Sequence, residues 1–491
     1  MKKHPHLLEI NAFFFVSRMS EKYGRKLTLA TIPDSEWRNF SKQGFDYLWL
    51  MGVWKRSPWS RAHAIKEPGL RYAYELILGR WSEEDVGGSP YAIYDYELDP
   101  FLGGIGELLQ LKMKLNGMGM GLVLDFVPNH LAVDHPWVVN FPERFVTAKP
   151  STVREHPEWF FNNPIGRKIA HGRDPYFPPW CDTAQVNFWA EPLRHAWIET
   201  LLKIAKMADG VRCDMAMLGL NDVFDKVWGA HVKTPRPTDE FWGPAISRVK
   251  AQHPGFIFIG EVYWDMDWLL QQQGFDFTYD KRLYDRMKHD APESVSAHLD
   301  AHPDYRDKCL RFIENHDEDR APVIFGRKKS QATAVITSTS PGLRFFHDGQ
   351  CEGRRIRTPI HLVREPKEPA DPEAVGFYQR LLEFIKGAVI HDGEWSLLGV
   401  GKAWEKNESH RGLLAWLWHL EGHWKLVILN YSMIRAQGII FLPDTLKQQV
   451  FIQFKEALTG QVYERTGSEL ARQGLYVDLE PWQSHLFDFK T

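Results

Sequence analysis

Short apolar runs alternate with segments of helical periodicity from Leu8 to Ile390. This alternation is typical of β-strand and α-helix units that form a parallel sheet. Several runs are apolar on consecutive residues, as in strands that are covered on both faces. The expected strands span residues 9–16, 46–51, 121–126, 210–213, 256–260, 275–279, 309–313 and 343–347. Eight such units predict a (β/α)8 TIM barrel rather than an open doubly wound sheet, and no Gly-x-Gly-x-x-Gly motif follows the first strand.

Two helices between the strands have a clear apolar periodicity. In the first, Pro192 precedes apolar positions at spacings of three and four, as expected for a proline in the first turn of a helix. Its buried face is predicted to contain Leu193, Ala196, Trp197, Thr200, Leu201 and Ile204. In the second helix the corresponding positions are Val375, Tyr378, Leu382 and Ile385.

Two connections are too long for simple strand-to-helix loops. Residues 53–100 follow the second strand, and residues 131–190 follow the third. Loops of this length are usually functional, so we interpret 131–190 as a small inserted domain over the barrel mouth. From residue 394 the pattern changes to strict alternation, with strands expected at 413–418, 425–430 and 475–479. The predicted division is a barrel over 1–130 and 191–393, an inserted domain over 131–190, and a C-terminal antiparallel β-sandwich over 394–491.

Composition and charge exclude several classes of function. The formal charge is −3 and there is no block of basic residues, so neither nucleic acid nor an anionic membrane is an expected partner. Four scattered cysteines without a Cys-x-x-Cys pair indicate neither a zinc site nor a disulfide framework. The N-terminal apolar run is interrupted by Glu9, Asn11 and Arg18, unlike a secretory signal, and no run is long enough to cross a bilayer. We therefore expect a cytoplasmic protein, and its oligomeric state is unknown.

Acidic and histidine side chains gather where the predicted strands end. Asp214 and Glu261 follow the fourth and fifth strands, whose carboxyl ends meet at one rim of a barrel. Cleavage of a glycosidic bond with retention requires two carboxyl groups roughly 5 to 5.5 Å apart, one nucleophile and one acid/base. Arg212 leaves the strand on the same face as Asp214, so its guanidinium is expected to hold that carboxylate ionised. Glu261 has apolar neighbours, and desolvation is expected to raise its pKa to that of a working acid.

A third carboxylate and two histidines join this group. Asp317 follows the seventh strand and is placed to stabilise an oxocarbenium-like transition state, while His130 and His316 can donate hydrogen bonds to a sugar. Each residue has a plainer interpretation, since an aspartate at a strand exit often caps a helix and a histidine is often a satisfied core residue. A metal pair is a further alternative, but no His-x-His or His-Glu-x-x-His motif supports it. The joint occurrence on four strands favours catalysis.

These segments resemble the four signatures of the α-amylase superfamily, glycoside hydrolase family 13. The matching segments are residues 125–130, 210–214, 260–262 and 314–317, in the family's order, with looser similarity at 44–50, 89–96 and 341–350. The resemblance implies Asp214 as nucleophile, Glu261 as acid/base and Asp317 as transition-state stabiliser. It also implies that the reacting glucose is held by Arg212, His130, His316 and Asp125, with Tyr91 as a stacking platform.

The chain departs from the family pattern at two places. Starch-cleaving members carry a Lys-His pair three and four residues after the nucleophile, where this chain has Met217 and Leu218. In the family an asparagine such as Asn129 can bind calcium, but Gln185 stands where an aspartate ligand is expected. A neutral amide is a weak ligand for a hard cation, so no cofactor is expected to be required.

The predicted function is hydrolysis of α-glucosidic bonds in an α-linked gluco-oligosaccharide or disaccharide, through a covalent glycosyl-enzyme intermediate. An α-glucanotransferase or a glucosyl isomerase uses the same intermediate and differs in what accepts the sugar. A catalytically silent carbohydrate-binding protein is a third reading, because fold alone does not determine function.

Overall fold

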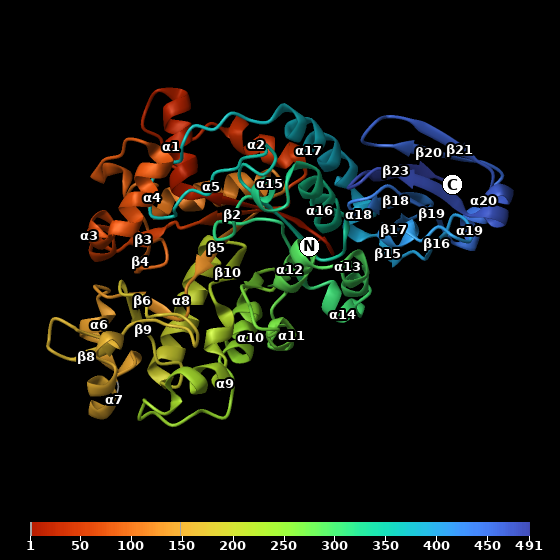
Figure 1. Ribbon diagram of the computed structural model, residues 1–491. Helices are drawn as coiled ribbons and strands as arrows, with labels where there is room; N and C mark the ends of the chain where they lie inside the picture. The colour runs from red at the N-terminus through yellow and green to blue at the C-terminus, as the bar shows by residue number, and fades with distance from the viewer. Residues whose placement is uncertain (1, 148) are drawn as a thin grey trace.

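The computed structural model describes residues 2–147 and 149–491; Met1 and Ala148, which fall within the expected barrel and inserted domain, lie outside the described residues. Eight parallel strands form a closed barrel in the order β1-β14-β13-β12-β11-β10-β5-β2, surrounded by helices (Figure 1). The predicted (β/α)8 fold is confirmed. The barrel strands are β1 (His6–Asn11), β2 (Tyr47–Met51), β5 (Gly121–Phe126), β10 (Gly210–Cys213), β11 (Ile257–Gly260), β12 (Phe277–Tyr279), β13 (Cys309–Arg311) and β14 (Leu343–His347).

The first strand differs from its prediction. β1 ends at Asn11, and the apolar residues that follow it, through Val16, belong to helix α1 (Ala12–Tyr23). The Asn11 side chain accepts hydrogen bonds from the backbone N–H groups of Phe13 and Phe14, which makes it the N-cap of this helix. The expected strand over 9–16 was therefore wrong in its second half, because the apolar run continues across a helix start.

The long helices between the strands bury the faces that the periodicity predicts. All six predicted positions on α8 (Glu191–Met207) are buried, and proline stands in its first turn. On α17 (Pro372–Ile385) the prediction was wrong for Val375, which is 40 % exposed, because the buried face there turns to include Phe377 and Leu381. The remaining α-helices of the barrel are α2 (Asp34–Gln43), α5 (Ile105–Gly117), α9 (Asn221–Phe224), α10 (Trp242–Gln252), α11 (Asp267–Gln272), α12 (Lys281–His289), α13 (Pro292–Leu299), α14 (Pro303–Arg306), α15 (Ala321–Ile324), α16 (Arg327–Thr339) and α18 (Ala388–Asp392).

Two connections extend over the mouth of the barrel. After β2 the chain forms β3 (Trp54–Arg56), α3 (Pro58–Lys66), α4 (Pro68–Leu78) and β4 (Ile93–Leu98), with β3 antiparallel to β4. After β5 it forms α6 (Trp137–Asn140), α7 (Pro150–Glu155) and two small sheets, β6 (His130–Ala132) with β9 (Thr183–Gln185) and β7 (Phe160–Asn162) with β8 (Lys168–Ala170). This second connection, residues 131–190, is called the excursion below; it lies at the lower left of Figure 1.

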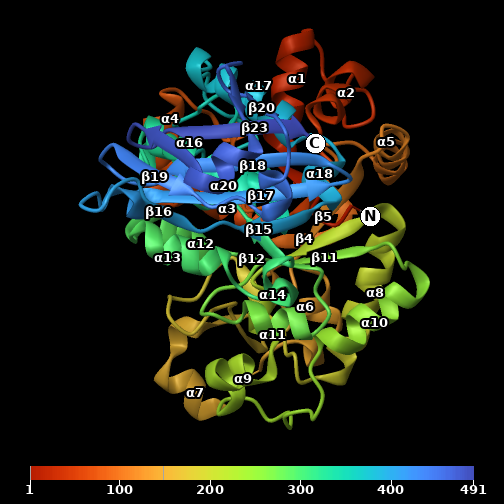
Figure 2. The same cartoon turned by 90° about the vertical axis from the view of Figure 1, so that its right-hand side faces the viewer.

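The C-terminal part consists of two antiparallel sheets, in agreement with the predicted β-rich region. One sheet has six strands in the order β15-β17-β18-β23-β20-β21, and the other has the order β16-β19-β22; Figure 2 looks onto them with the barrel behind. The Trp418 indole donates a hydrogen bond to the Thr339 carbonyl of α16, so these sheets are packed against the barrel. Their elements are β15 (Glu394–Leu397), β16 (Val400–Lys402), β17 (Leu413–Leu420), β18 (His423–Asn430), β19 (Ala436–Ile440), α19 (Asp444–Lys447), β20 (Ile452–Glu456), β21 (Val462–Arg465), α20 (Gly467–Gln473), β22 (Leu475–Leu479) and β23 (Ser484–Lys490).

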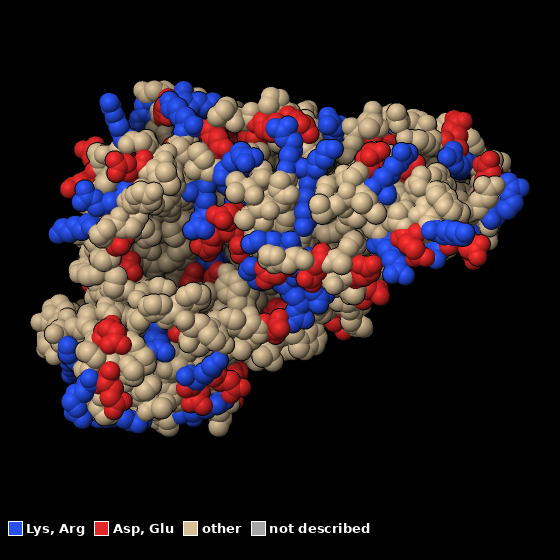
Figure 3. All heavy atoms as spheres, in the orientation of Figure 1, with Lys and Arg blue, Asp and Glu red and all other residues tan. Residues whose placement is uncertain are grey.

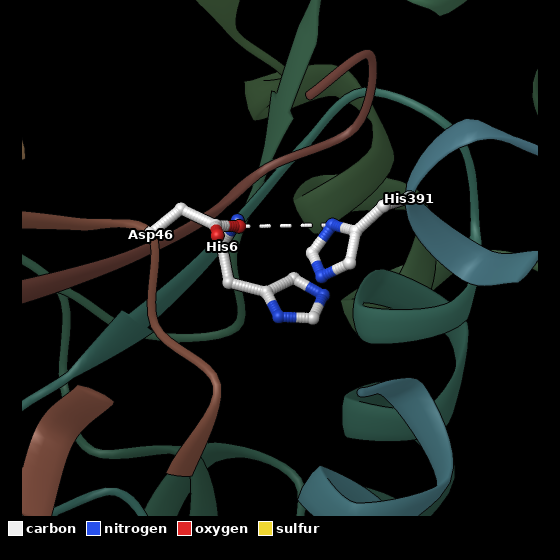
Figure 4. Close-up of side chains that lie close together, drawn as sticks. All are labelled: His6, Asp46 and His391. Carbon is white, nitrogen blue, oxygen red and sulfur yellow. Dashed lines mark hydrogen bonds and ion pairs between the residues drawn. The ribbon is translucent and has the colours of Figure 1, made fainter. Parts of the chain in front are cut away.

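At the opposite end of the barrel from the mouth, His6, Asp46 and His391 lie close together (Figure 4). Their spacing would suit a metal ion, but cations of the protein are already present. Lys2 Nζ lies 2.7 Å from Asp46, and the Arg344 guanidinium lies 3.3 Å from His6 Nε2. We interpret this group as a buried polar cluster that connects the start of the first strand to α18, the last helix of the barrel.

None of the described helices combines the length and the apolar character that crossing a bilayer requires.

Candidate active site

The ends of two neighbouring strands bring Asp214 and Glu261 together. β10 and β11 pair in register, with Cys213 opposite Gly260, so the next residue on each strand faces its counterpart. The Glu261 N–H donates to the Cys213 carbonyl at 3.0 Å, which extends the ladder to the two acids. Asp214 is 7 % exposed and Glu261 is 3 % exposed. The strand register thus places both acids side by side at the carboxyl ends of their strands, as the sequence predicts.

One buried guanidinium binds both carboxylates. Arg212 Nη1 lies 2.8 Å from Asp214 Oδ1, and Nη2 lies 2.7 Å from Glu261 Oε2. The two terminal nitrogens of a guanidinium form a planar fork, so groups bound to both lie side by side on one edge. Asp214 and Glu261 therefore point into the same space, as a double displacement requires.

Burial changes the acidity of both groups. Desolvation, opposed by Arg212, raises the pKa of Glu261 to about 7, in the direction expected from its apolar neighbours. Desolvation also raises the pKa of Asp214, again opposed by Arg212. Arg212 acts in the direction expected from the sequence, because it favours the ionised carboxylate, whereas the depth of burial that raises the pKa could not be seen there.

The loop after β10 directs a further donor at Glu261. Met215 has a φ of 41°, in the left-handed region that a non-glycine residue adopts only under constraint. In this conformation its backbone N–H donates to Glu261 Oε2 at 2.7 Å. The Tyr263 hydroxyl donates to the other oxygen, Oε1, at 2.9 Å. Glu261 is therefore held at both oxygens.

Asp317, His316 and Tyr91 form a second group across the pocket. His316 Nε2 lies 3.1 Å from Asp317 Oδ2 and 2.7 Å from the Tyr91 hydroxyl, and its ring stacks on the Tyr91 ring with centroids 5.5 Å apart. Burial lowers the pKa of His316, but the neighbouring carboxylates outweigh burial and raise it well above the ordinary value. The Asp317 side chain is 49 % exposed. Desolvation acts to raise the pKa of Asp317, but the ion pair with His316 outweighs it and lowers the pKa. This group presents an ionised carboxylate and a cationic imidazole to the pocket.

Asp125 and His130 complete the predicted set. Asp125 accepts hydrogen bonds from the Trp49 indole at 3.2 Å and the Gly52 N–H at 2.8 Å, and it lies 3.8 Å from Arg212. Burial raises the pKa of Asp125 to about 7, and burial lowers the pKa of His130 to about 4. His130 is therefore neutral near pH 7, with one N–H to donate. Contacts of Arg212 and His316 join seven of the eight predicted site residues, and the eighth, His130 on β6, packs against Trp180.

Glu9 is a site residue that the sequence reasoning missed. It lies at 0 % exposure near the end of β1, where His316 Nδ1 contacts its Oε1. Its other oxygen, Oε2, has no hydrogen-bond partner among the described atoms and lies 3.8 Å from His347. In the sequence, Glu9 only interrupts an apolar run. A charge inside a strand that is otherwise buried was the available signal, because a buried carboxylate requires a partner.

The residues at the position where the resembling family binds calcium do not fit the ion. Gln185 Nε2 donates to the Asn129 side-chain oxygen at 2.9 Å and to the Asn129 carbonyl at 3.0 Å. Calcium requires oxygen ligands directed at one point, and here an N–H group is directed at the two oxygens that Asn129 would supply. We therefore assign no step of the chemistry to a cation at this position.

The side of the pocket next to Glu261 is spacious. Met217 and Leu218, which replace the Lys-His pair of starch-cleaving members, are buried in a short 3₁₀ helix and offer no polar contact. Directly after Glu261 in the chain, Val262 and Tyr263 line a cavity of about 540 Å³, together with Trp264, Asp265, Tyr279, Lys281 and Arg286, among others. Figure 3 shows the molecule hollowed between the segment with α3 and α4 above and the excursion below.

Comparisons of the sequence with known proteins identify relatives over much of the chain. Alpha-amylase 3 of Dictyoglomus thermophilum is 24 % identical over 427 residues, 75 % of this chain and 79 % of that protein. The alpha-1,4-glucan:maltose-1-phosphate maltosyltransferase of Rhodospirillum rubrum is 32 % identical over 258 residues, 51 % of this chain. The chain spans only 30 % of the length of that maltosyltransferase. No family model matches the sequence.

Solved structures share the fold over the whole chain. A noncanonic maltogenic alpha-amylase from Thermotoga neapolitana superposes with a TM-score of 0.69 at 19 % identity and covers 100 % of this chain and 99 % of its own. The alpha-amylase from H. orenii gives a TM-score of 0.69 at 16 % identity, with 100 % of both chains covered. At these identities the structural matches show only that the fold is shared, whereas the sequence matches support a common ancestry with the relatives.

Proposed function

Because the chain belongs to the α-amylase superfamily, glycoside hydrolase family 13, we propose that it hydrolyses α-glucosidic bonds in α-linked gluco-oligosaccharides with retention of configuration. The observation that carries this proposal is the contact of Arg212 with both Asp214 and Glu261. It places two carboxyl groups with different surroundings on one edge of a single guanidinium. The named activities of the relatives, amylase and maltosyltransferase, support an α-glucan as substrate.

In the first step, Asp214 attacks the anomeric carbon while Glu261 donates its proton to the departing glycosidic oxygen. The carbon–oxygen bond to the leaving sugar breaks, and a glycosyl ester forms on Asp214. The pKa of about 7 keeps a large fraction of Glu261 protonated at neutral pH, as a general acid requires. Arg212 stabilises the ionised form of Asp214 that attacks.

In the second step, Glu261 is ionised and removes a proton from water, whose oxygen attacks the anomeric carbon and releases Asp214. Two inversions at one carbon restore the original configuration. Asp317 and the cationic His316 are placed across the pocket, where they hold the sugar hydroxyls as positive charge develops on the ring. Asp125 and His130 contact the same ring from the side of β5.

The proposal is tested with Asp214→Asn, which removes the attacking charge while keeping the side-chain shape. We expect turnover of maltotriose to fall by on the order of 10³-fold or more, because no glycosyl ester can form. Asp222→Asn is the control, since its side chain is 85 % exposed and lies outside the pocket. Circular dichroism should show both variants folded. Near-normal turnover by Asp214→Asn would contradict the assignment.

A second candidate is transfer of the glycosyl unit to another sugar. The cavity of about 540 Å³ beside Glu261 favours it, because an acceptor sugar held there can replace water in the second step. Several relatives are named as maltosyltransferases, among them those of Rhodospirillum rubrum and Picrophilus torridus. Incubation with maltotriose distinguishes the two outcomes: oligosaccharides longer than the substrate indicate transfer, whereas only shorter products indicate hydrolysis.

A further inference from the structure

Buried acidic and basic side chains alternate behind His316. One ring nitrogen of His316, Nε2, faces Asp317, and the other, Nδ1, contacts Glu9. The second oxygen of Glu9, Oε2, lies 3.8 Å from Nε2 of His347, and Nδ1 of His347 lies 2.8 Å from Nη1 of Arg320. His347 is thus the next basic group behind Glu9.

The strand register places His347 beside Glu9. β1 and β14 are parallel neighbours, and Glu9 is directly opposite His347. Side chains of opposite residues on paired strands leave the sheet on the same face. The Asp348 N–H donates to the Glu9 carbonyl at 2.9 Å, so the ladder extends past this pair. His347 therefore approaches Glu9 from the adjacent strand, where the first and last strands of the barrel meet.

The contact with Arg320 determines which nitrogen of His347 carries the proton. A guanidinium has only donors, so Nδ1 of His347 is the acceptor in this contact. The neutral ring then carries its proton on Nε2, on the Glu9 side. Arg320 is itself fixed, because its Nη1 also donates to Glu314 Oε1 at 2.7 Å, and the other Glu314 oxygen accepts the Ala321 N–H at 2.7 Å. The ring of His347 is thus held with a donor toward Glu9.

One water molecule is enough to span the distance between His347 and Glu9. Their separation of 3.8 Å is longer than a direct hydrogen bond. A cavity of about 20 Å³, lined by Asn11, His316 and His347 among others, has room for one water molecule. Glu9 Oε2 and Asn11 Nδ2 are both buried without a hydrogen-bond partner among the described atoms, and the two residues are on the same face of β1. A water between them would accept from His347 and Asn11 and donate to Glu9, and three partners are usual for a buried water.

The two histidines act on the charge of Glu9. Burial acts to raise the pKa of Glu9, but the imidazoles of His316 and His347 outweigh it, and the pKa is lowered. An ionised Glu9 in turn favours the imidazolium form of His316, which also faces Asp317 and the Tyr91 hydroxyl. Loss of the contact from His347 would therefore weaken Glu9 as a partner of His316.

The geometry points to His347 as a positioning residue: it fixes the carboxylate of Glu9, and Glu9 fixes the imidazolium of His316 that faces the sugar. This inference rests on the proposed function and adds a residue to its machinery. His347 acts through Glu9 rather than on the substrate. Its effect on the rate arises because His316 must keep its orientation and charge while positive charge develops on the sugar ring.

Two amide variants separate this role from a purely structural one. In His347→Gln the side-chain nitrogen stands where Nε2 stood, so a donor toward Glu9 is kept and the acceptor for Arg320 is lost. His347→Asn does the reverse, because its side-chain oxygen stands where Nδ1 stood. We expect His347→Asn to lower kcat/KM on maltotriose about tenfold and His347→Gln by no more than about threefold, since only the first loses the hydrogen bond that serves Glu9. Equal losses, or the reverse order, would overturn the inference, because His347 would then serve only the packing or Arg320.

A double-mutant cycle with Glu9→Gln tests whether His347 acts through Glu9. Without the carboxylate, the addition of His347→Asn should change kcat/KM by no more than about twofold, whereas independent roles would give the full loss again. Such a full loss would overturn the inference. Rates are expressed per folded molecule, from thermal melts followed by circular dichroism, so that a loss of stability does not enter the comparison. Failure of the unaltered protein to convert maltotriose or any other α-glucan would overturn the proposed function and this inference with it, whereas any of the contrary variant patterns overturns this inference alone.

Discussion

At the scale of single residues, the acidity of Glu261 leads to a prediction about pH. Its pKa of about 7 means that the proton needed by the leaving oxygen is lost above neutral pH. We expect kcat/KM to fall as the pH rises through about 7. Tyr263→Phe removes a donor that favours the ionised carboxylate, so the pKa of Glu261 should rise and the alkaline limb should move to higher pH.

The measurement is the pH profile of kcat/KM for both proteins. Tyr476→Phe is a matched control, because it deletes the same hydroxyl from an exposed position in the C-terminal sheets. An alkaline limb that stays in place, or moves to lower pH, in Tyr263→Phe would show that Glu261 is not the proton donor.

Glu9 leads to a second prediction at this scale. His316 faces Glu9, Asp317, the Tyr91 hydroxyl and the edge of Trp49, and the carboxylates keep the imidazole protonated. Glu9→Gln replaces one anion by a neutral amide of the same shape, so the pKa of His316 should decrease. We expect the loss of kcat/KM at pH 8 to exceed the loss at pH 6 by about tenfold, since an imidazolium is then missing only at the higher pH. A role confined to packing would lower both rates equally.

The contrast between Glu9 and the three proposed catalytic carboxylates shows what a sequence reveals about a site. Asp214, Glu261 and Asp317 stand at strand exits, where local pattern alone indicates the rim of a barrel. Glu9 lies inside the first strand, and its partner His316 is 307 residues away. Only closure of the barrel brings the two together, so no local pattern contains that contact.

At the scale of elements, the prediction was best where the chain is apolar on both faces. β5, β10 and β14 begin and end at the expected residues, because buried parallel strands are bounded by polar or glycine positions. The first strand was extended too far because α1 begins with residues as apolar as the strand itself, and Asn11 as an N-cap was the overlooked signal.

The junction of β6 and β9 gives a prediction about metal removal. Gln185 uses its N–H group to hold both oxygens of Asn129, which leaves no set of ligands directed at a cation. We expect a chelator such as EDTA to change neither the melting temperature nor kcat/KM. Gln185→Asp restores an anionic oxygen, so this variant should gain a calcium-dependent rise in melting temperature, measured by calorimetry. A loss of stability of the unaltered protein in EDTA would refute this interpretation.

At the scale of the whole molecule, the packing of the long connections and of the C-terminal sheets against the barrel could not be predicted from the sequence. The expected barrel, excursion and β-rich region were each identified by period and length. The contacts that orient them, such as Val86 with Leu362 or Trp418 with Thr339, join segments that no periodicity links. The connection after β2 was recognised as unusually long, but its bridge to the segment between β14 and α17 lies outside any local pattern.

The polar cluster of His6, Asp46 and His391, at the end of the barrel opposite the mouth, gives a prediction about stability in acid. Burial is the largest cause of the lowered pKa of His6, with Arg344 and His391 acting in the same direction, so the ring stays neutral in the folded protein. In the unfolded chain it takes up a proton below about pH 6.5. The stability contributed by the neutral ring is therefore complete above pH 6.5 and is lost as the pH falls below it.

Measured melting temperatures between pH 7 and pH 5 check this sign. His6→Gln should flatten the decline with falling pH, whereas His302→Gln, at a position where the side chain is 77 % exposed, should leave the slope unchanged. A steeper decline in His6→Gln would mean that the ring is protonated in the folded state.

β1 pairs with β14, from His6 opposite Arg344 to Glu9 opposite His347. The first strand of the barrel therefore completes its hydrogen bonding only after the last strand has been synthesised. A nascent chain that ends before β14 contains Asp214, Glu261 and His316, but it has neither the strand that closes the barrel nor His347 beside Glu9. The pocket is therefore assembled only once this late stretch of polypeptide is present, because closure of the barrel is what brings its rim together.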